Sequence, residues 1–382
     1  MSEKRIKAEH GVIYSRGNDT LFGYFAWPSV CRIGEHKLMA AASGFRTGHV
    51  DPFGKSVCFY SEDDGRTWSE PEIVNNSPID DRDAGLTDLG NGRALLSWVT
   101  SDTRPLVADK SKDSLLTRRY RMNFAPILTQ WDEAVVAANV GSFVRIREAD
   151  GTWGDRRYAL VSAPHGPIKL RDGRLFYLGS EARYYPAYRS GVMLGDVAAT
   201  VSADEGASWE LVSRVKRPDA GMWCEPHALE LPNGEILGML RYEFRDGRSS
   251  HIGKGARYYS ANHKDFSIYS VRSADGGKSW SEPVLITSGS PPSLMMHSSG
   301  VIVLSYSWRR ENPGQRLRFS KDGGKSWSDE WILRDDGPDY DLGYPSTVEL
   351  ADGTLYTVYY QKTEAGALNC SFLSSHWELP KF

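Results

Sequence analysis

Cysteines and long apolar stretches are both scarce in this chain of 382 residues. No two of the four cysteines stand in a Cys-x-x-Cys spacing, so we expect free buried thiols, no metal site and no cofactor. No apolar run approaches the roughly 18 residues of a membrane-spanning helix, and the N-terminus lacks the apolar core of a secretion signal. We therefore expect no membrane partner and a cytoplasmic location, or secretion if a signal peptide has been trimmed from the sequence as written.

An excess of either charge is also missing. The 46 basic and 49 acidic side chains give a net charge of −3, and the densest basic run, Arg118–Arg121, is too short to indicate nucleic-acid binding. Apolar residues with helical spacing are almost absent, with a short turn at Lys110–Leu116 as the exception. These absences argue against a nucleic-acid partner and favour a protein built from β-strands.

What the chain does contain is an eight-residue pattern, Ser-x-Asp-x-Gly-x-x-Trp, which occurs four times. The copies are Ser61–Trp68, Ser202–Trp209, Ser273–Trp280 and Ser320–Trp327. The pattern predicts a tight β-hairpin, because the Asp accepts backbone N–H groups within the turn and the Gly adopts a positive φ. Four copies indicate a repeated structural unit, and turn chemistry explains each fixed position without a bound ion.

A second repeat consists of two short apolar strands joined by a turn. Six such hairpins have turns near Gly34 and at Asn91–Gly92, Asp172–Gly173, Asn233–Gly234, Ser299–Gly300 and Asp352–Gly353. Four strands in each of six units predict an all-β fold, a six-bladed β-propeller of four-stranded antiparallel blades. No linker divides the chain, so we expect one domain over residues 1–382. The second unit keeps only Asp150–Trp153 of the turn pattern, and the segment through Tyr14 is expected to complete the last blade.

These repeats resemble the Asp boxes, or BNR repeats, of the sialidase (neuraminidase) superfamily. The resemblance implies a glycoside hydrolase that removes a terminal, possibly acidic, sugar from an oligosaccharide, with retention and a tyrosine nucleophile. The family's nucleophile motif is similar to Gly343–Ser346, which implies Tyr344 as the nucleophile. The family's glutamate motif is similar to the segment from Glu225 to Arg241, which implies Glu225 as the partner of the tyrosine. Asp51 lies in the stretch that holds the family's acid/base aspartate.

The tyrosine and the glutamate are expected to touch. A phenol has an ordinary pKa near 10, so it attacks poorly at neutral pH unless a neighbouring base accepts its proton. We therefore predict that Tyr344 and Glu225, 119 residues apart in sequence, lie within hydrogen-bonding distance.

The resemblance also implies three arginines that bind the sugar carboxylate. Arg241 fits one of them, and four residues of the fifth unit compete for another: Arg309, Arg310, Arg316 and Arg318, of which we favour Arg316. The chain departs from the family at the first arginine, where it has Ala26; Arg46 or Arg32 is the alternative donor. This departure argues against sialic acid and favours a neutral or differently placed acidic sugar. Trp27 beside it is expected either to stack on a sugar or to pack between blades.

Two histidines at the starts of inner strands complete the candidate residues. His165 and His227 are expected either to bind substrate or to pack between blades. If they converge with Tyr344 and no acid is present, a lyase that abstracts a proton beside a uronate carboxylate is the alternative function. A non-catalytic carbohydrate-binding propeller is the third hypothesis, and it predicts that Tyr344 and Glu225 do not touch. The oligomeric state is left open.

Overall fold

The structure is a computed structural model that describes residues 3–18, 20–104, 122, 124–128, 130–181, 196–216, 221–243 and 266–382. The predicted turn at Lys110–Leu116 and the basic run Arg118–Arg121 lie outside these residues. No helix within the described residues is long and apolar enough to cross a membrane.

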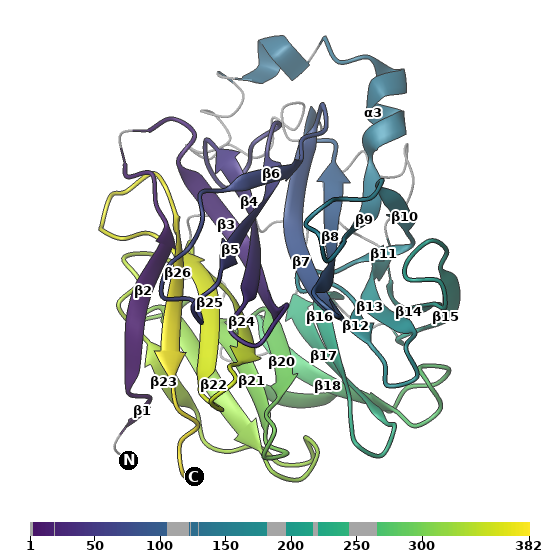
Figure 1. The fold of residues 1–382 in the computed structure, drawn as a ribbon, viewed down its shortest axis with the longest axis vertical. Coiled ribbons are helices and arrows are strands. Elements are labelled where there is room, and N and C mark those ends of the chain that lie inside the picture. Colours follow the sequence, from purple (N-terminus) through teal and green to yellow (C-terminus); the bar gives the residue numbers. More distant parts are fainter. Residues whose placement is uncertain are drawn as a thin grey trace.

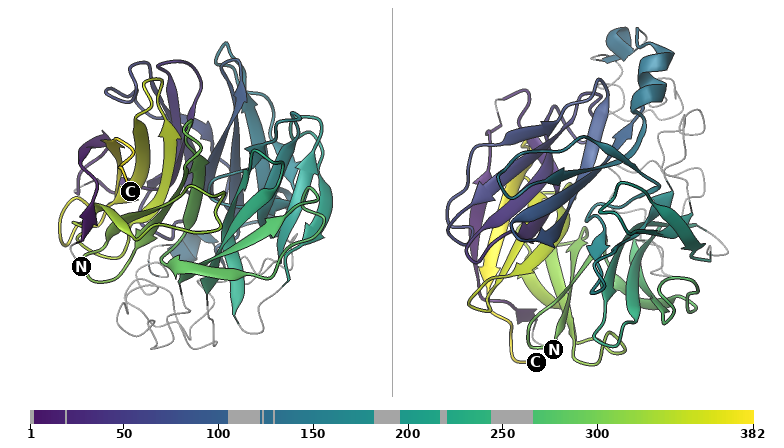
Figure 2. Two further views of the ribbon diagram at one scale, coloured as in Figure 1. Left: turned by 90° about the horizontal axis from the view of Figure 1, so that it is seen from below. Right: turned by 45° about the vertical axis from the view of Figure 1, so that its right-hand side comes forward.

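Six antiparallel sheets follow one another around a common centre (Figures 1 and 2), which confirms the predicted six-bladed β-propeller. Blade one comprises β3 (Tyr24–Arg32), β4 (Leu38–Arg46), β5 (Lys55–Ser61) and β6 (Glu72–Asn75). Blade two comprises β7 (Asp80–Gly90), β8 (Arg93–Ser101), β9 (Gly141–Arg147) and β10 (Arg157–Ala159). Blade three comprises β11 (Val161–Ser162), β12 (Ile168–Lys169), β13 (Leu175–Glu181), β14 (Val197–Ser202) and β15 (Glu210–Arg214).

The remaining three blades follow the same plan. Blade four comprises β16 (Met222–Glu230), β17 (Ile236–Glu243), β18 (Ser267–Ser273) and β19 (Val284–Ser288). Blade five comprises β20 (Pro292–Met296), β21 (Ile302–Trp308), β22 (Gly314–Ser320) and β23 (Trp331–Arg334), with β1 (Lys4–Arg5) parallel to β23 at its edge. Blade six comprises β24 (Gly343–Glu349), β25 (Leu355–Gln361), β26 (Ser371–Trp377) and β2 (Ala8–Tyr14).

The N-terminal strand closes the ring, as predicted. β2 pairs antiparallel with β26, so the last blade takes its outer strand from the beginning of the chain. The ring is therefore closed by hydrogen bonds between two strands that lie far apart in the sequence.

The four Asp boxes form the predicted turns. In the first, the Ser61 hydroxyl donates to Asp63 Oδ1 at 2.8 Å and accepts from the Gly65 N–H at 2.8 Å. The Asp63 carboxylate also accepts the N–H and hydroxyl of Thr67, and Gly65 has a φ of +83°. Hydrogen bonds of the same pattern recur in the other three copies. The boxes are therefore structural turns.

The hydrophobic core lies between adjacent blades. One cluster joins blades six and one through Phe25, Phe59, Val358 and Phe372, and comparable clusters fill the other five interfaces. The Trp of each Asp box packs against one of these clusters. Burial of aromatic and branched side chains between sheets thus holds the ring together.

One element was not predicted. Helix α3 (Glu133–Asn139) lies at one end of blade two (Figure 1) and follows Asp132, whose carboxylate accepts the Ala134 N–H at 2.7 Å as an N-cap. Val136 of α3 packs on Ile79 and Val99, so a single buried valine anchors this short helix to the blade.

Candidate active site

The first strands of four blades share a β-bulge at the same register position. In β3, β7, β16 and β24, two residues face one residue of the neighbouring second strand. The first residue of each pair has a left-handed backbone: Trp27 (φ 53°), Asp83 (φ 60°), Glu225 (φ 44°) and Tyr344 (φ 55°). A positive φ at a non-glycine residue costs roughly 1–3 kcal/mol and concentrates at functional sites. Bulges also re-aim side chains near active sites. These four residues therefore define the candidate site.

Tyr344 and Glu225 are in direct contact, as predicted. The Tyr344 hydroxyl donates to Glu225 Oε1 at 2.6 Å, although the residues belong to blades six and four. The other carboxylate oxygen, Oε2, accepts from Arg241 Nη1, and Arg241 Nη2 forms an ion pair with Glu243. This contact contradicts the separation that the hypothesis of a non-catalytic propeller predicted.

The environment of Tyr344 keeps its phenol protonated. Burial raises the pKa of Tyr344 well above its ordinary value, the negative charge of Glu225 raises it further, and the positive charge of Arg241 opposes these effects. A free phenolate is therefore disfavoured. Tyr344 can act as a nucleophile only if Glu225 accepts the proton while the new bond forms.

Gly343 is required by the geometry at Tyr344. Its φ is +128°, and a Cβ at this position would lie 2.0 Å from Ser307 Oγ. That same hydroxyl accepts the Tyr344 N–H at 3.1 Å. The glycine of the Gly-Tyr motif thus lets blade six approach the end of β21 and fixes the backbone that carries the nucleophile candidate.

Asp83 is a candidate that sequence reasoning missed. Its side chain is only 6% exposed and makes no hydrogen bond to any described residue. Burial raises the pKa of Asp83 to about 6; the charge of Arg82 opposes this rise and the charge of Glu225 adds to it. Asp83 in turn raises the pKa of Tyr344. A carboxyl group that titrates near neutrality beside a candidate nucleophile is suited to general acid–base catalysis.

A signal for Asp83 was present in the sequence. It stands eight positions before the turn of its hairpin, as Glu225 and Tyr344 stand eight positions before theirs. Residues at the same offset from the turn of equivalent hairpins occupy equivalent places in the blades, so aligning the hairpins on their turns would have found it.

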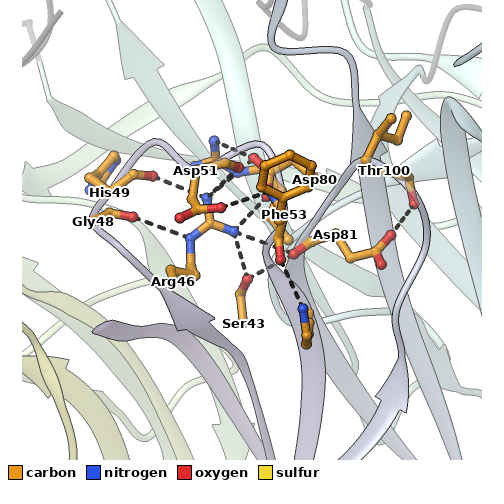
Figure 3. A network of polar contacts seen from close by, with 12 residues as sticks. Ser43, Arg46, Gly48, His49, Asp51, Phe53, Asp80, Asp81 and Thr100 are labelled. Carbon is orange, nitrogen blue, oxygen red and sulfur yellow. Dashed lines mark hydrogen bonds and ion pairs between the residues drawn. The ribbon is translucent and has the colours of Figure 1, made fainter. Parts of the chain in front are cut away.

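Asp51, predicted as the acid, is placed differently. Its carboxylate accepts the Thr47 N–H at 2.7 Å, the Thr47 hydroxyl at 2.6 Å and the Phe53 N–H at 2.7 Å (Figure 3). The side chain is buried, and both of its oxygens hold the loop that contains it. The geometry therefore assigns Asp51 a structural part in this loop and does not support the predicted acid/base role.

Arg46, predicted as a substitute for the missing arginine, is fully buried. Its guanidinium forms a two-point ion pair with Asp80, at 2.6 and 3.2 Å, and also donates to Ser43 Oγ and to the carbonyls of Gly48 and His49 (Figure 3). Because its donors are occupied and none is exposed, the prediction that Arg46 binds substrate is wrong.

Trp27 packs and does not present an open ring. It is 1% exposed, in a cluster with Tyr24, Tyr344 and other buried residues. The guanidinium groups of Arg46 and Arg82 lie over its ring, at 4.8 and 4.3 Å from the centroid. Of the two predicted roles, packing is therefore the one that the structure supports.

Arg309, and not the favoured Arg316, is the fifth-blade arginine beside Tyr344. Arg309 follows β21, and its guanidinium lies 5.6 Å from the Tyr344 ring centroid.

Arg316 lies on the third strand, β22, where it donates to the carbonyls of Asn312 and Arg334. It borders a separate hollow of about 290 Å³. The prediction that Arg316 shares a site with Arg241 is therefore wrong. Of the other two competitors, Arg310 lies over Trp308 and Arg318 donates to the Ser328 carbonyl.

His165 and His227 face each other, with ring centroids 5.4 Å apart. Burial lowers the pKa of His227 to about 4 and holds that of His165 well below its ordinary value, so both are neutral near pH 7. His227 Nδ1 accepts the Leu294 N–H at 2.9 Å, whereas neither ring nitrogen of His165 has a partner among the described residues. No hydrogen bond among the described residues joins either histidine to Tyr344.

A pair of mostly buried polar side chains borders the site. His49 Nδ1 lies 3.0 Å from Asp341 Oδ1, and the Tyr24 hydroxyl donates to the same carboxylate at 3.0 Å. Burial raises the pKa of Asp341, but the charge of His49 and other contacts outweigh burial and lower it to about 2. In the part of the chain that the structure describes, no group of three or more His, Cys, Asp or Glu side chains is arranged to hold a metal ion.

Comparisons with known proteins agree with this architecture. Residues 160–357 match the profile of a family described as BNR repeat-like domain. A protein of unknown function from Dyadobacter fermentans DSM 18053 is similar over all of both chains, with 20% identity and a TM-score of 0.72. The intramolecular trans-sialidase from Ruminococcus gnavus, solved with oseltamivir carboxylate, has 15% identity and a TM-score of 0.62, with 97% of each chain covered.

The NanB sialidase from Streptococcus pneumoniae has 14% identity and a TM-score of 0.63, with 96% of this chain and 70% of that chain covered. At such identities the similarity shows the fold alone. No curated protein sequence matches the chain.

Proposed function

Because the chain belongs to the BNR repeat-like domain family, we propose that it is a sialidase-like glycoside hydrolase with Tyr344 as its nucleophile. The observation that carries the proposal is the 2.6 Å hydrogen bond from the Tyr344 hydroxyl to Glu225 across two blades. Both residues have strained left-handed backbones at equivalent bulges, which supports a functional arrangement.

Asp83 is the proposed acid/base, in place of Asp51. In the first half of the reaction, Tyr344 Oη bonds to the anomeric carbon and passes its proton to Glu225. The glycosidic C–O bond breaks, and the leaving oxygen takes the proton of Asp83. In the second half, water attacks the anomeric carbon and gives a proton to Asp83, while Tyr344 leaves and recovers its proton from Glu225. Two displacements at one carbon retain its configuration.

The burial of the site supports attack on a chain end. Tyr344 is 4% exposed and Asp83 is 6% exposed, so an internal sugar with a chain on both sides would fit poorly. Arg241 is already paired with Glu225 and Glu243, and Ala26 supplies no guanidinium. The pairing of Arg241 and the absence of an arginine at position 26 favour a terminal sugar other than sialic acid. The resemblance to sialidases implies three arginines that bind the carboxylate of sialic acid.

Turnover on a panel of aryl glycosides tests the proposal. The panel holds aryl hexosides, deoxyhexosides and hexuronides, sialyl-lactose is assayed beside it, and NMR follows the anomer first released. We expect one non-sialic glycoside to be hydrolysed with retention, and Tyr344→Phe and Glu225→Gln to lose at least about a hundredfold in kcat. Tyr340→Phe, an exposed tyrosine, is the matched control.

Three outcomes would contradict the proposal. The first is no turnover on any glycoside, although Tyr344→Phe folds and binds one of them. The second is an unsaturated product that absorbs in the ultraviolet, which indicates a lyase. The third is efficient release of sialic acid, with kcat/KM of about 10⁴ M⁻¹s⁻¹ or more, which would refute the proposed substrate class.

A further inference from the structure

The place of the missing arginine is filled by apolar side chains. Ala26 is fully buried in a cluster with Tyr24, Trp27, Tyr344 and Tyr360. Arg46 cannot take this place, because its side chain is fully buried and is held by Asp80 against the Trp27 ring. A substrate anion at the mouth therefore needs a cation from another element.

Arg82 is a cation of this kind. It immediately precedes Asp83 in β7, its side chain is 21% exposed, and its guanidinium lies 4.3 Å from the centroid of the Trp27 ring. Stacking on an aromatic ring orients a guanidinium without occupying its N–H groups. The Trp27 ring thus holds Arg82 in position and leaves the N–H donors along the edge of the guanidinium group accessible.

The donors of Arg82 are largely unoccupied. It makes no hydrogen bond to any described residue, and its one ion pair is a 3.7 Å approach to Asp80 Oδ2. That carboxylate is already bound by Arg46 at 2.6 and 3.2 Å, so Asp80 does not need Arg82 for its charge balance. A guanidinium with five donors and no close acceptor is suited to binding an anionic oxygen group.

The neighbours of Arg82 place it at the mouth of the site. The imidazole of His49 packs against the same Trp27 ring as Arg82, with the two ring centroids 5.0 Å apart. Burial lowers the pKa of His49, Asp341 opposes this effect, and the positive charges of Arg82 and Arg309 lower the pKa further. Arg309 in turn lies over Tyr344. An anion between Arg82 and Arg309 would therefore sit beside the nucleophile candidate, on the side of blades one and two.

We propose that Arg82 binds a carboxylate of the substrate sugar, from blade two, in place of the arginine that blade one lacks. The inference rests on the proposed function and narrows its substrate class to a sugar acid, with a carboxylate placed differently from that of sialic acid. An anion held there also favours the protonated form of Asp83, which the acid role requires.

Binding of matched acid and neutral probes to the wild-type protein and its variants tests the inference by calorimetry. The pairs are methyl glucuronide with methyl glucoside, and methyl galacturonide with methyl galactoside. Arg82→Met keeps an apolar stem on Trp27 without the charge, Arg82→Lys keeps the charge, and Arg174→Met removes an exposed charge elsewhere as the control. We expect an acid to bind more tightly than its neutral partner, and Arg82→Met to reduce that preference by about 10- to 100-fold. Arg82→Lys should retain part of the preference, and Arg174→Met should retain all of it.

The inference is overturned if neither acid is preferred, if Arg82→Met leaves the preference unchanged, or if Arg174→Met reduces it equally. Turnover is measured separately, so the two proposals fail in different ways. Arg82-dependent binding without turnover contradicts only the proposed function. Turnover with Arg82-independent binding contradicts only the role of Arg82.

Discussion

Loss of either partner of the buried ion pair between Arg46 and Asp80 should strongly destabilise the fold. Both side chains are fully buried, and Arg46 donates to both Asp80 oxygens (Figure 3). Removing one partner of such a pair leaves an uncompensated charge in the interior, at a cost of about 3–5 kcal/mol. We expect Arg46→Met and Asp80→Asn each to lower the free energy of unfolding by about that amount. Urea unfolding at pH 7 measures it.

The double variant separates loss of the pair from loss of packing. Arg46→Met with Asp80→Asn leaves no unpaired charge, so it should be destabilised by clearly less than the sum of the single variants. Arg174→Met breaks an exposed pair with Asp172 and should cost under about 1 kcal/mol. Additive single variants, or a cost for Asp80→Asn no larger than that for Arg174→Met, would refute the reasoning.

Three further predictions concern single residues. If Asp83 is the acid, kcat/KM should fall as the pH rises through about 6, because the protonated carboxyl is then lost. Asp83→Asn should abolish this fall in kcat/KM and lose about 10²–10⁴-fold in activity. A wild-type profile that is flat from pH 5 to 8 would argue against the assignment. Gly343→Ala should destabilise the fold by at least about 1–3 kcal/mol, measured by thermal unfolding, because its φ is +128° and the new Cβ collides with Ser307; an unchanged melting temperature would contradict this. Hydrogen bonds from the Ser208 hydroxyl and N–H lower the pKa of Asp204 to about 2, below its value of about 3.9 in the unfolded chain. The stabilisation of the fold by ionised Asp204 is therefore present above pH 4 and is lost as the pH falls through about 2. Asp204→Ala should therefore cost about 0.5–1.5 kcal/mol at pH 7 and clearly less at pH 2, and an equal cost at both values would refute the assignment.

The fold could be predicted because short-range chemistry determines it. Each Asp box contains its own acceptor, hydroxyl and positive-φ glycine within eight residues, and each hairpin contains its own turn. Neither needs a distant partner to be recognised, so counting them predicted the blades. Helix α3 was missed because only Val136 is buried in it, and one apolar position gives no helical period.

The site was predicted only in part, because a sequence shows which groups exist and not which are already occupied. Tyr344 and Glu225 could be paired from their motifs. Arg46 and Asp51 looked equally available, yet the first is held by Asp80 and the second by its own loop. Asp83 and Arg82 are site candidates because, unlike Arg46 and Asp51, each has few partners among the described residues. Only the packing of blades one and two reveals this difference.

The closure of blade six by β2 has a consequence for synthesis of the protein. Ala8 pairs with Trp377, so β2 is synthesised long before β26, its partner strand. At about 5–20 residues per second, synthesis of the 356 residues between β2 and β26 takes roughly 20–70 s, during which β2 has no partner strand. An unpaired strand invites aggregation, and charged side chains reduce that hazard. The N-terminal segment carries Lys4, Arg5, Lys7 and Glu9, and three of the seven residues of β2 remain exposed even in the finished blade. The charged side chains that precede and begin β2 thus suit the long interval before its partner strand is made.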